Sequence, residues 1–194
     1  MNKKMKEPGA NLYPVPAVMV SCADETGKKN IITIAWTGVL ASDPPAVGVG
    51  VRPNRYSYDL IDKSREFVIN LPDNETFAAL DYCGVVSGRD VDKFAATQLT
   101  PAEPDVLEYA PLIKECPINL ECEVIKCVSL QSHDYFVGQV KRTHVASKWV
   151  GDRDEILPHP EEMISYARNT YYNLGQAMGK SGFAVRENIF SDDG

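Results

Sequence analysis

The 194-residue chain contains no apolar run near the roughly 20 residues that a membrane-spanning helix needs. Its basic first ten residues are not followed by an apolar stretch, so a secretory signal is not expected. Basic residues are also few, because 20 Lys and Arg stand against 27 Asp and Glu, for a formal net charge of −7. Nucleic-acid phosphates select clustered Lys and Arg. We therefore expect a cytoplasmic protein with no membrane or nucleic-acid partner.

Spacings that would bind a metal ion are missing as well. The five cysteines include no Cys-x-x-Cys pair, and the three histidines do not stand near them in a ligand pattern. Zinc sites need such spacings, so no metal is expected. Thiols without close pairing are typical of buried, reduced cysteines in a reducing compartment, the alternative being that one lies close to a bound cofactor. The cysteines are Cys22, Cys83, Cys116, Cys122 and Cys127.

Two familiar signatures are also absent. Gly48-Val49-Gly50 resembles the opening of a dinucleotide fingerprint, but Val51-Arg52-Pro53 follows, with no third glycine and no helix start. We interpret this run as a strand. The spacing of the side chains gives no Ser–His–Asp or Cys–His arrangement, so no catalytic side chain is predicted.

Apolar patterns of period two predict a mainly β fold. Strands are expected over residues 15–23, 28–36, 46–51, 67–71, 118–128 and 135–146, with a hairpin turn at Asp24–Gly27. Only short helices, over 57–63 and 76–83, are expected among them. Strands with such short connections favour a closed β-barrel over a doubly wound sheet. The length favours a single domain over residues 1–194, with its core at about 10–150.

The chain changes character after residue 150. Met163, Tyr166 and Thr170 follow one another at helical spacing, so a helix is expected over 161–173. Residues 151–194 are therefore predicted to form a C-terminal helical extension of the barrel. The tyrosines at 166, 171 and 172 either pack in the core or an interface, or cover an aromatic ligand.

The segment Asn30–Gly38 is the most informative for function. On a strand, Thr33, Ala35 and Thr37 share one face, while Asn30 and Trp36 share the other. Gly38 then opens a loop rich in small and hydroxyl-bearing residues. Hydroxyls and exposed main-chain N–H groups on this surface suit a flat aromatic heterocycle with several carbonyl acceptors. The alternative is an ordinary strand with a tight connection.

A second segment, Ser87–Phe94, has the composition of a phosphate site. It places Ser87, Gly88, Arg89 and Lys93 within seven positions. Glycine lets the backbone approach a phosphate closely, and the two cations supply charge-assisted hydrogen bonds. The alternative is a solvated turn in which neighbouring aspartates at 90 and 92 pair with the cations.

Taken in chain order, these segments and four others resemble the flavin reductase-like family of FMN-binding split β-barrels. The resemblance covers roughly residues 10 to 150. The motifs that carry it are Asn30–Pro45, Arg55–Ile61, Glu66–Pro72, Ser87–Phe94, Cys116-Pro117 and His133–Val140.

The resemblance implies a Greek-key split barrel that holds FMN, a cofactor able to exchange two electrons. Arg89, Lys93 and Ser57 would neutralise its phosphate, and backbone groups around Ala35–Gly38 would hydrogen-bond the ring carbonyls. Trp36 would pack by the ring or wall the pocket, unless it is a core tryptophan, and His133 would lie close to the flavin. The positions expected to contact FMN are Asn30, Thr33, Ala35, Trp36, Thr37, Gly38, Ser57, Ser87, Arg89, Lys93 and His133.

Three functions remain open from the sequence. The resemblance implies a homodimer and, most directly, an enzyme that passes electrons from NAD(P)H to flavin or to another small acceptor. A flavoredoxin-like electron carrier with a protein partner is the second possibility. A non-catalytic split-barrel module that binds flavin or haem is the third. The chain carries no nicotinamide-binding motif that separates the first two.

Overall fold

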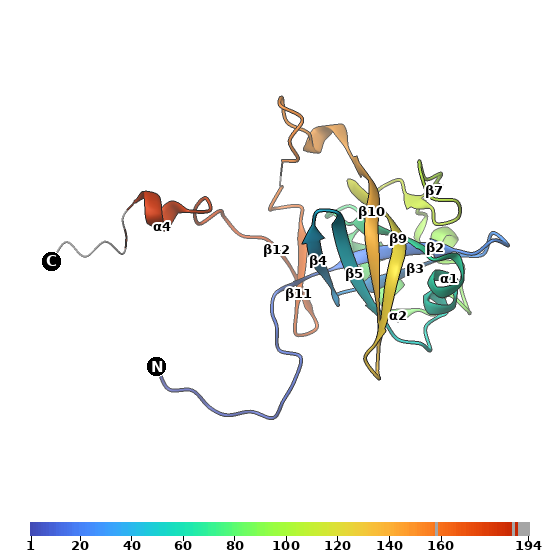
Figure 1. Cartoon of the computed structure of the whole chain (residues 1–194), viewed down its shortest axis with the longest axis horizontal. Coiled ribbons are helices and arrows are strands. Elements are labelled where there is room, and N and C mark those ends of the chain that lie inside the picture. Colours follow the sequence, from blue (N-terminus) through green and yellow to red (C-terminus); the bar gives the residue numbers. More distant parts are fainter. Residues whose placement is uncertain (158, 188, 190–194) are drawn as a thin grey trace.

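The computed structural model describes residues 1–157, 159–187 and 189. Its centre is a seven-stranded antiparallel sheet with the order β3-β2-β6-β9-β10-β5-β4 (Figure 1). The bounds are β2 Val18–Ala23, β3 Lys29–Ile34, β4 Thr37–Ser42, β5 Pro45–Val51, β6 Glu66–Leu71, β9 Ile118–Ser129 and β10 Asp134–Val145. The predicted strands are present, as period-two patterning requires of a sheet with a buried face.

The hydrogen-bonded ladder is not closed. Its two ends are β3 and β4, which follow one another in the chain and are linked through Ala35 and Trp36. The expected closed barrel is wrong in this respect, because these two residues leave the ladder and split it. The loop expected at Thr37 and Gly38 is also wrong, since both residues lie in β4 and pair with β5.

The sheet is buried on both faces along β2 and β3. Alternate side chains of β2 enter two different clusters, with Val20 in the barrel interior and Met19 in the layer outside. Helix α1, Tyr56–Ser64, contributes Leu60 and Ile61 to the interior cluster. Helices α2, Phe77–Val85, and α3, Lys93–Thr97, cover the other face of β3. Both faces of β3 are thus packed against other elements, which fixes the position of the strand.

The linker between α3 and β9 is attached through its main chain. It contains the short strands β7, Pro101–Ala102, and β8, Leu112–Ile113. Glu66 accepts hydrogen bonds from the N–H groups of residues 108, 109 and 110. The fully buried Glu121 accepts from those of residues 105, 106 and 107, and contacts His144 at 2.5 Å. Two carboxylates on adjacent strands therefore fix the path of this linker.

The C-terminal region is a hairpin and not the expected helix. β11, Ile164–Ala167, pairs with β12, Thr170–Asn173, and also with the short β1, Val15–Pro16. Arg168 and Asn169 form the turn with φ of 48° and 64°. A two-residue connection with both φ values positive is typical of a β-hairpin, and Asn tolerates it well. The β-branched and aromatic side chains of this segment fit a strand better than a helix.

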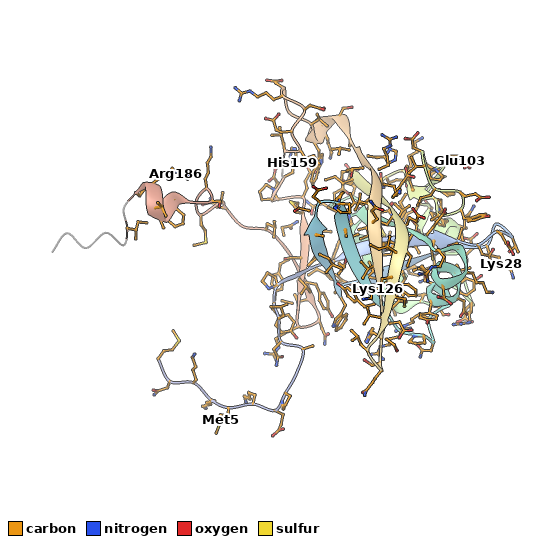
Figure 2. The ribbon with its side chains drawn as sticks, viewed as in Figure 1. Met5, Lys28, Glu103, Lys126, His159 and Arg186 are labelled. Atoms are coloured by element: carbon orange, nitrogen blue, oxygen red, sulfur yellow. The ribbon has the colours of Figure 1, made fainter. Side chains whose placement is uncertain are left out.

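The remaining helical elements are small. A 3₁₀ turn, η1, spans Ser147–Trp149, and α4, Phe183–Arg186, is a single turn. The two terminal segments extend away from the barrel, where Figure 2 marks them by Met5 and Arg186. In the part of the chain that the structure describes, no helix is both long and apolar enough to span a membrane.

Candidate cofactor site

A cavity of about 440 Å³ opens where β3 ends and the barrel is split. Its walls come from β3, the Ala35–Trp36 link, helix α2, the β9–β10 turn and the β11–β12 hairpin. We call it the main cavity. It is lined by Ala17, Ile32, Thr33, Ile34, Ala35, Trp36, Gly50, Arg52, Arg55, Asp81, Gly84, Val85, His133, Tyr166, Asn169 and Tyr171.

A smaller polar cavity of about 50 Å³ adjoins the main cavity. We call it the polar annex. Three residues, Ile32, Arg55 and Gly84, line both spaces, so the two are direct neighbours. The remaining walls of the polar annex are Asn30, Asn54, Tyr56, Ser57, Cys83, Val86, Ser87, Gly88, Arg89 and Lys93.

Lys93 is the buried cation of the polar annex. It is 4% exposed, and its ammonium donates to the carbonyls of Ile31 and Cys83, each at 2.7 Å. No carboxylate pairs with it in the described part of the chain. Burial lowers the pKa of Lys93. An ammonium in this position is costly unless a negative charge joins it, so the polar annex is suited to an anion.

The floor of the polar annex is a buried amide–hydroxyl pair. The Asn30 amide donates to the Ser57 hydroxyl at 2.8 Å, and both side chains are buried. Gly88 lies against this amide, because a Cβ at position 88 would stand 2.2 Å from the side-chain oxygen Oδ1 of Asn30. Ser57 makes this contact and does not cap helix α1, which begins one residue earlier. A glycine at position 88 therefore lets the 87–89 loop close over the floor.

Arg89 stands at the rim of the polar annex. Its guanidinium pairs with Asp59 at 3.3 Å, donates to the carbonyl of Asn54 and lies 5.6 Å from the ring centre of Tyr56. The alternative in which Arg89 and Lys93 pair with the aspartates at 90 and 92 is wrong. The second of these aspartates instead caps α3 by accepting from the N–H of residue 95. Both cations therefore face the polar annex.

Trp36 and His133 wall the opposite end of the main cavity. Their rings stack at 5.6 Å, and Trp36 is 56% exposed, which excludes a core role for it. Arg52 donates through Nε to Nε2 of His133 at 3.3 Å. Burial, together with Arg52 and Arg55, lowers the pKa of His133. His133 is thus a neutral ring at pH 7, with its Nε2 lone pair already accepting a hydrogen bond.

The C-terminal hairpin supplies the aromatic side of the main cavity. Tyr166 and Tyr171 lie 5.2 Å apart between ring centres, and Tyr171 meets Phe77 of α2 edge to face at 5.3 Å. Burial raises the pKa of Tyr171 to about 12, with Asp81 acting in the same direction. Tyr172 is exposed and lines no part of the site. The hairpin therefore covers part of the main cavity as well as packing on α2.

The structure divides the residues expected from the sequence among three places. The main cavity takes Thr33, Ala35, Trp36 and His133. The polar annex takes Asn30, Ser57, Ser87, Arg89 and Lys93. Thr37 and Gly38 line neither, because they continue into β4. The site residues not predicted from the sequence are Arg52, Arg55, Asp81, Asn169 and the closely packed Gly84. Arg55 is the first residue of the Arg55–Ile61 motif and Arg52 stands three positions before it, which was a usable signal.

The cysteines behave as apolar side chains. Cys22, Cys83, Cys116 and Cys122 are buried and unpaired, and Cys127 is half-buried. Burial raises the pKa of Cys83 to about 11 and that of Cys22 to about 12. Protonated thiols are poor nucleophiles, so Cys83 contributes to the wall of the polar annex as a small hydrophobic residue.

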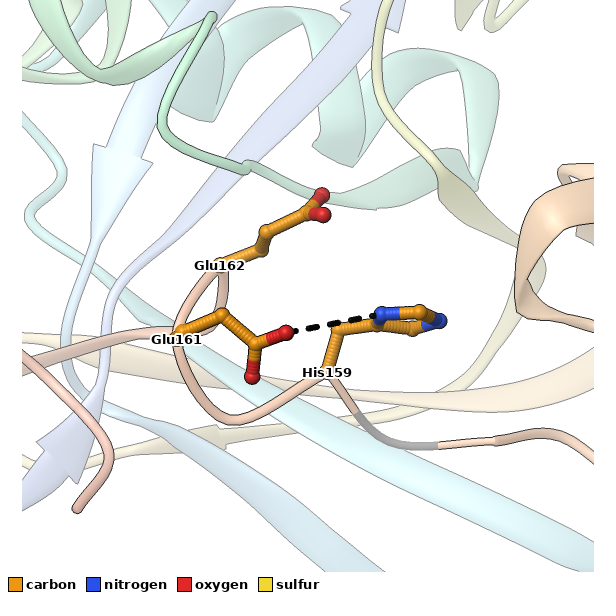
Figure 3. Close-up of side chains that lie close together, drawn as sticks. All are labelled: His159, Glu161 and Glu162. Atoms are coloured by element: carbon orange, nitrogen blue, oxygen red, sulfur yellow. Dashed lines mark ion pairs between the residues drawn. The ribbon is translucent and has the colours of Figure 1, made fainter. Parts of the chain in front are cut away.

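A separate group of titratable side chains lies before β11. His159, Glu161 and Glu162 stand close enough to hold a cation, and His159 lies 3.8 Å from Glu161 (Figure 3). Lys148 already pairs with Glu162 at 2.9 Å. The ammonium of Lys148 thus occupies one of the two carboxylates, and nothing else among these described residues points to a metal ion.

Comparison with known proteins places this site in a family. Residues 10–175 match the family model of the flavin reductase like domain, so the chain belongs to that family. The match includes the β11–β12 hairpin. An uncharacterized protein of Archaeoglobus fulgidus is 34% identical over 129 residues, which are 66% of this chain and 71% of that protein.

Two solved structures resemble the whole fold. Flavoredoxin of Desulfovibrio vulgaris (Miyazaki F) is 29% identical, with a TM-score of 0.86 over 95% of this chain and 100% of that chain. Flavoredoxin from Methanosarcina acetivorans is 26% identical, with a TM-score of 0.85 over 96% and 100%. The fold is that of the flavin reductase-like split barrels.

Proposed function

We propose that this protein binds FMN, with the isoalloxazine ring in the main cavity and the phosphate in the polar annex. The observation that carries the proposal is that these two spaces are direct neighbours, one roomy and flanked by aromatic rings, the other small and cationic. Membership of the flavin reductase-like family and likeness to two flavoredoxins support the same ligand.

The polar annex fits a dianionic phosphate in charge and in chemistry. Lys93 has two of its three ammonium protons engaged with carbonyls, so one remains for a ligand. Arg89 offers a guanidinium at the rim, and Ser57 and Ser87 offer hydroxyls. A phosphate in this place would satisfy the buried charge of Lys93, and charge-assisted hydrogen bonds are the strong ones.

The main cavity would hold and shield the ring system. Ala35 lies outside both strand ladders, so main-chain groups there are available to a ligand. Trp36, stacked on His133, closes one side, and the Tyr166–Tyr171 pair closes another. When bound, FMN supplies reversible two-electron transfer, which no side chain of the site provides. The neutral His133 and the nearby Arg52 would set the electrostatic field around it.

We propose that the protein is an FMN-dependent oxidoreductase that takes electrons from NAD(P)H and passes them to flavin or another acceptor. Trp36 lines the main cavity and is itself exposed, so this wall lies at the molecular surface, within reach of a small-molecule reactant. A flavoredoxin-like electron carrier is the second candidate, supported by the likeness to two flavoredoxins over nearly the whole chain.

Spectroscopy of the purified protein separates these candidates. We expect a yellow protein whose flavin absorbance bleaches under argon when NADPH or NADH is added. Bleaching with dithionite or a reduced protein partner, but with neither nucleotide, would assign the carrier function. A colourless protein that gains no flavin when incubated with FMN would refute the FMN proposal itself and leave a non-catalytic module.

We further propose that the protein forms a homodimer. The edge strand β4 supports this, because Val39 is 80% and Leu40 is 49% exposed on it. An exposed apolar edge strand is a surface that proteins normally cover. Sedimentation should give twice the chain mass, and Val39→Lys should shift the protein toward monomer. A monomer at micromolar concentration would contradict the proposal.

A further inference from the structure

A second cavity of about 360 Å³ adjoins the main cavity and has a different character. It shares Ala35, Trp36, Tyr166 and Asn169 with the main cavity, so a molecule in it would contact one in the main cavity. Its other walls include Tyr13, from the segment before β1, and Tyr135 of β10. We call this space the aromatic chamber, since four aromatic side chains line it.

The fold makes room specifically for the ring of Tyr135. The register places Tyr135 opposite Gly50. A Cβ at Gly48 would stand 2.1 Å from Cε1 of the Tyr135 ring, and one at Gly50 would stand 3.4 Å from its Cδ2. The two glycines of the Gly48-Val49-Gly50 run therefore let the ring lie flat on β5. The two glycines are thus explained by the space that the Tyr135 ring needs at the floor of the chamber, and not by a nucleotide-binding turn.

Two polar groups of the aromatic chamber are suited to an anion or a carbonyl. The Tyr135 hydroxyl has no hydrogen-bond partner within the described chain. Burial raises the pKa of Tyr135, so this phenol remains a donor at neutral pH. Arg168, at the tip of the β11–β12 turn, has no ion-pair partner in the described ranges. No Asp or Glu is among the described residues that line the chamber.

Arg168 is held at the chamber by the hairpin itself. Asn169 shares the turn and accepts a hydrogen bond from the Tyr166 hydroxyl at 2.9 Å. This contact ties the turn to a ring that lines both cavities. Arg168 is exposed, and its side chain provides a positive charge beside the apolar, aromatic walls of the chamber.

We propose that the aromatic chamber binds the second reactant of the protein, a flat aromatic carbonyl compound with an acidic substituent. Its ring would lie among Trp36 and Tyr135, its carbonyl would accept from the Tyr135 hydroxyl, and Arg168 would hold the acidic group. The proposal rests on the proposed function for the reaction that the bound molecule undergoes, but binding itself does not depend on that function.

Calorimetric titration with two probes tests the proposal directly. Anthraquinone sulfonate is flat, carries carbonyls and has one negative charge, and hydroxymethyl anthraquinone is its neutral counterpart. We expect the sulfonate to bind wild-type protein more tightly than the neutral probe does. Arg168→Gln should weaken the sulfonate about tenfold, the size of a lost charge-assisted hydrogen bond, and leave the neutral probe unchanged. Tyr135→Phe should weaken both probes several-fold.

Arg153→Gln provides the matched control. Arg153 is exposed on another turn and lines neither cavity, but its replacement removes the same charge. If Arg153→Gln and Arg168→Gln lose equal affinity for the sulfonate, the proposal is overturned, because the loss would then come from the change in net charge. Failure of both probes to bind protein that retains FMN would also overturn it while sparing the proposed function. Probe binding to protein that never retains FMN would support the chamber and refute the proposed function.

Discussion

Replacement of Lys93 by methionine tests the polar annex most sharply. The apolar stem of the side chain is kept, and only the ammonium is lost. Hydrogen bonds to charged groups contribute about 1.5–3 kcal/mol each. Because about 1.4 kcal/mol corresponds to a factor of ten, the Kd for FMN should rise about 10- to 150-fold. Arg89→Gln should have a smaller effect, since Arg89 is half exposed and pairs with Asp59.

The same replacement also acts on the fold. The carbonyls of Ile31 and Cys83 lose their donor, and a buried acceptor without a partner costs about 1–3 kcal/mol. Removal of the buried charge offsets part of that loss. We therefore expect the free energy of unfolding to fall by less than the sum for two carbonyls, which is about 2–6 kcal/mol.

Riboflavin separates the effect on phosphate from the effect on the fold. It has the isoalloxazine ring but no phosphate, so Lys93→Met should change its affinity little. Flavin-free protein is titrated with each flavin, and quenching of the flavin fluorescence gives the Kd for FMN and the Kd for riboflavin. Lys126→Met on β9 removes an exposed charge far from the polar annex and should alter neither. Equal losses of FMN and riboflavin affinity in Lys93→Met would show that Lys93 does not bind the phosphate.

Three further changes have defined outcomes. Trp36→Ala should remove an electron-rich ring that quenches a neighbouring flavin, so the fluorescence of bound flavin should rise. Gly48→Ala should drive a Cβ into the Tyr135 ring and lower the free energy of unfolding in urea by about 1–3 kcal/mol. Burial alone would raise the pKa of Glu121, but hydrogen bonds from His144 and three main-chain N–H groups lower it. Glu121 therefore stabilises the fold above its unfolded pKa, and that contribution is lost as the pH falls through the folded pKa. Glu121→Gln should flatten the acid limb of the unfolding free energy below about pH 4.5, the ordinary pKa of the carboxyl group.

Controls for these changes come from neighbouring positions. Gly38→Ala should be nearly neutral, because a Cβ there meets nothing within 4 Å. If it destabilises as much as Gly48→Ala, packing against Tyr135 is not the cause. Glu123 is exposed and lies two residues from Glu121, so Glu123→Gln should keep the acid dependence of the unfolding free energy. Unchanged flavin fluorescence in Trp36→Ala would place the ring of the cofactor elsewhere.

The strands of the barrel were predictable from the sequence because alternation is a local property. β2, β6 and β9 are confirmed, since their side chains must separate between two faces whatever the rest of the chain does. The β11–β12 hairpin was not predictable by the same reasoning. Tyr166 and Thr170 are four positions apart, which fits one face of a helix, and only the turn at Arg168 and Asn169 decides for a hairpin.

The site was predictable in composition but not in arrangement. From the sequence we predicted that Lys93 and Arg89 bind a phosphate. No local pattern indicated that Lys93 is buried against two carbonyls or that Arg89 stands at the rim. Likewise, no local pattern indicates that Arg52 reaches His133, 81 positions away. Contacts of this range depend on how β5 and β10 pair, which only the folded sheet determines.

The way in which Glu66 and Glu121 hold the 105–110 linker limits where proline can stand. Both carboxylates are bound to amides of the peptide backbone, so these hydrogen bonds make no demand on the side chains that the linker carries. They do require an N–H at each position they bind, and proline has none. The prolines at 104 and 111 stand just outside this stretch, whereas the side chains of Asp105, paired with Arg142, and of the buried Ala110 are constrained separately.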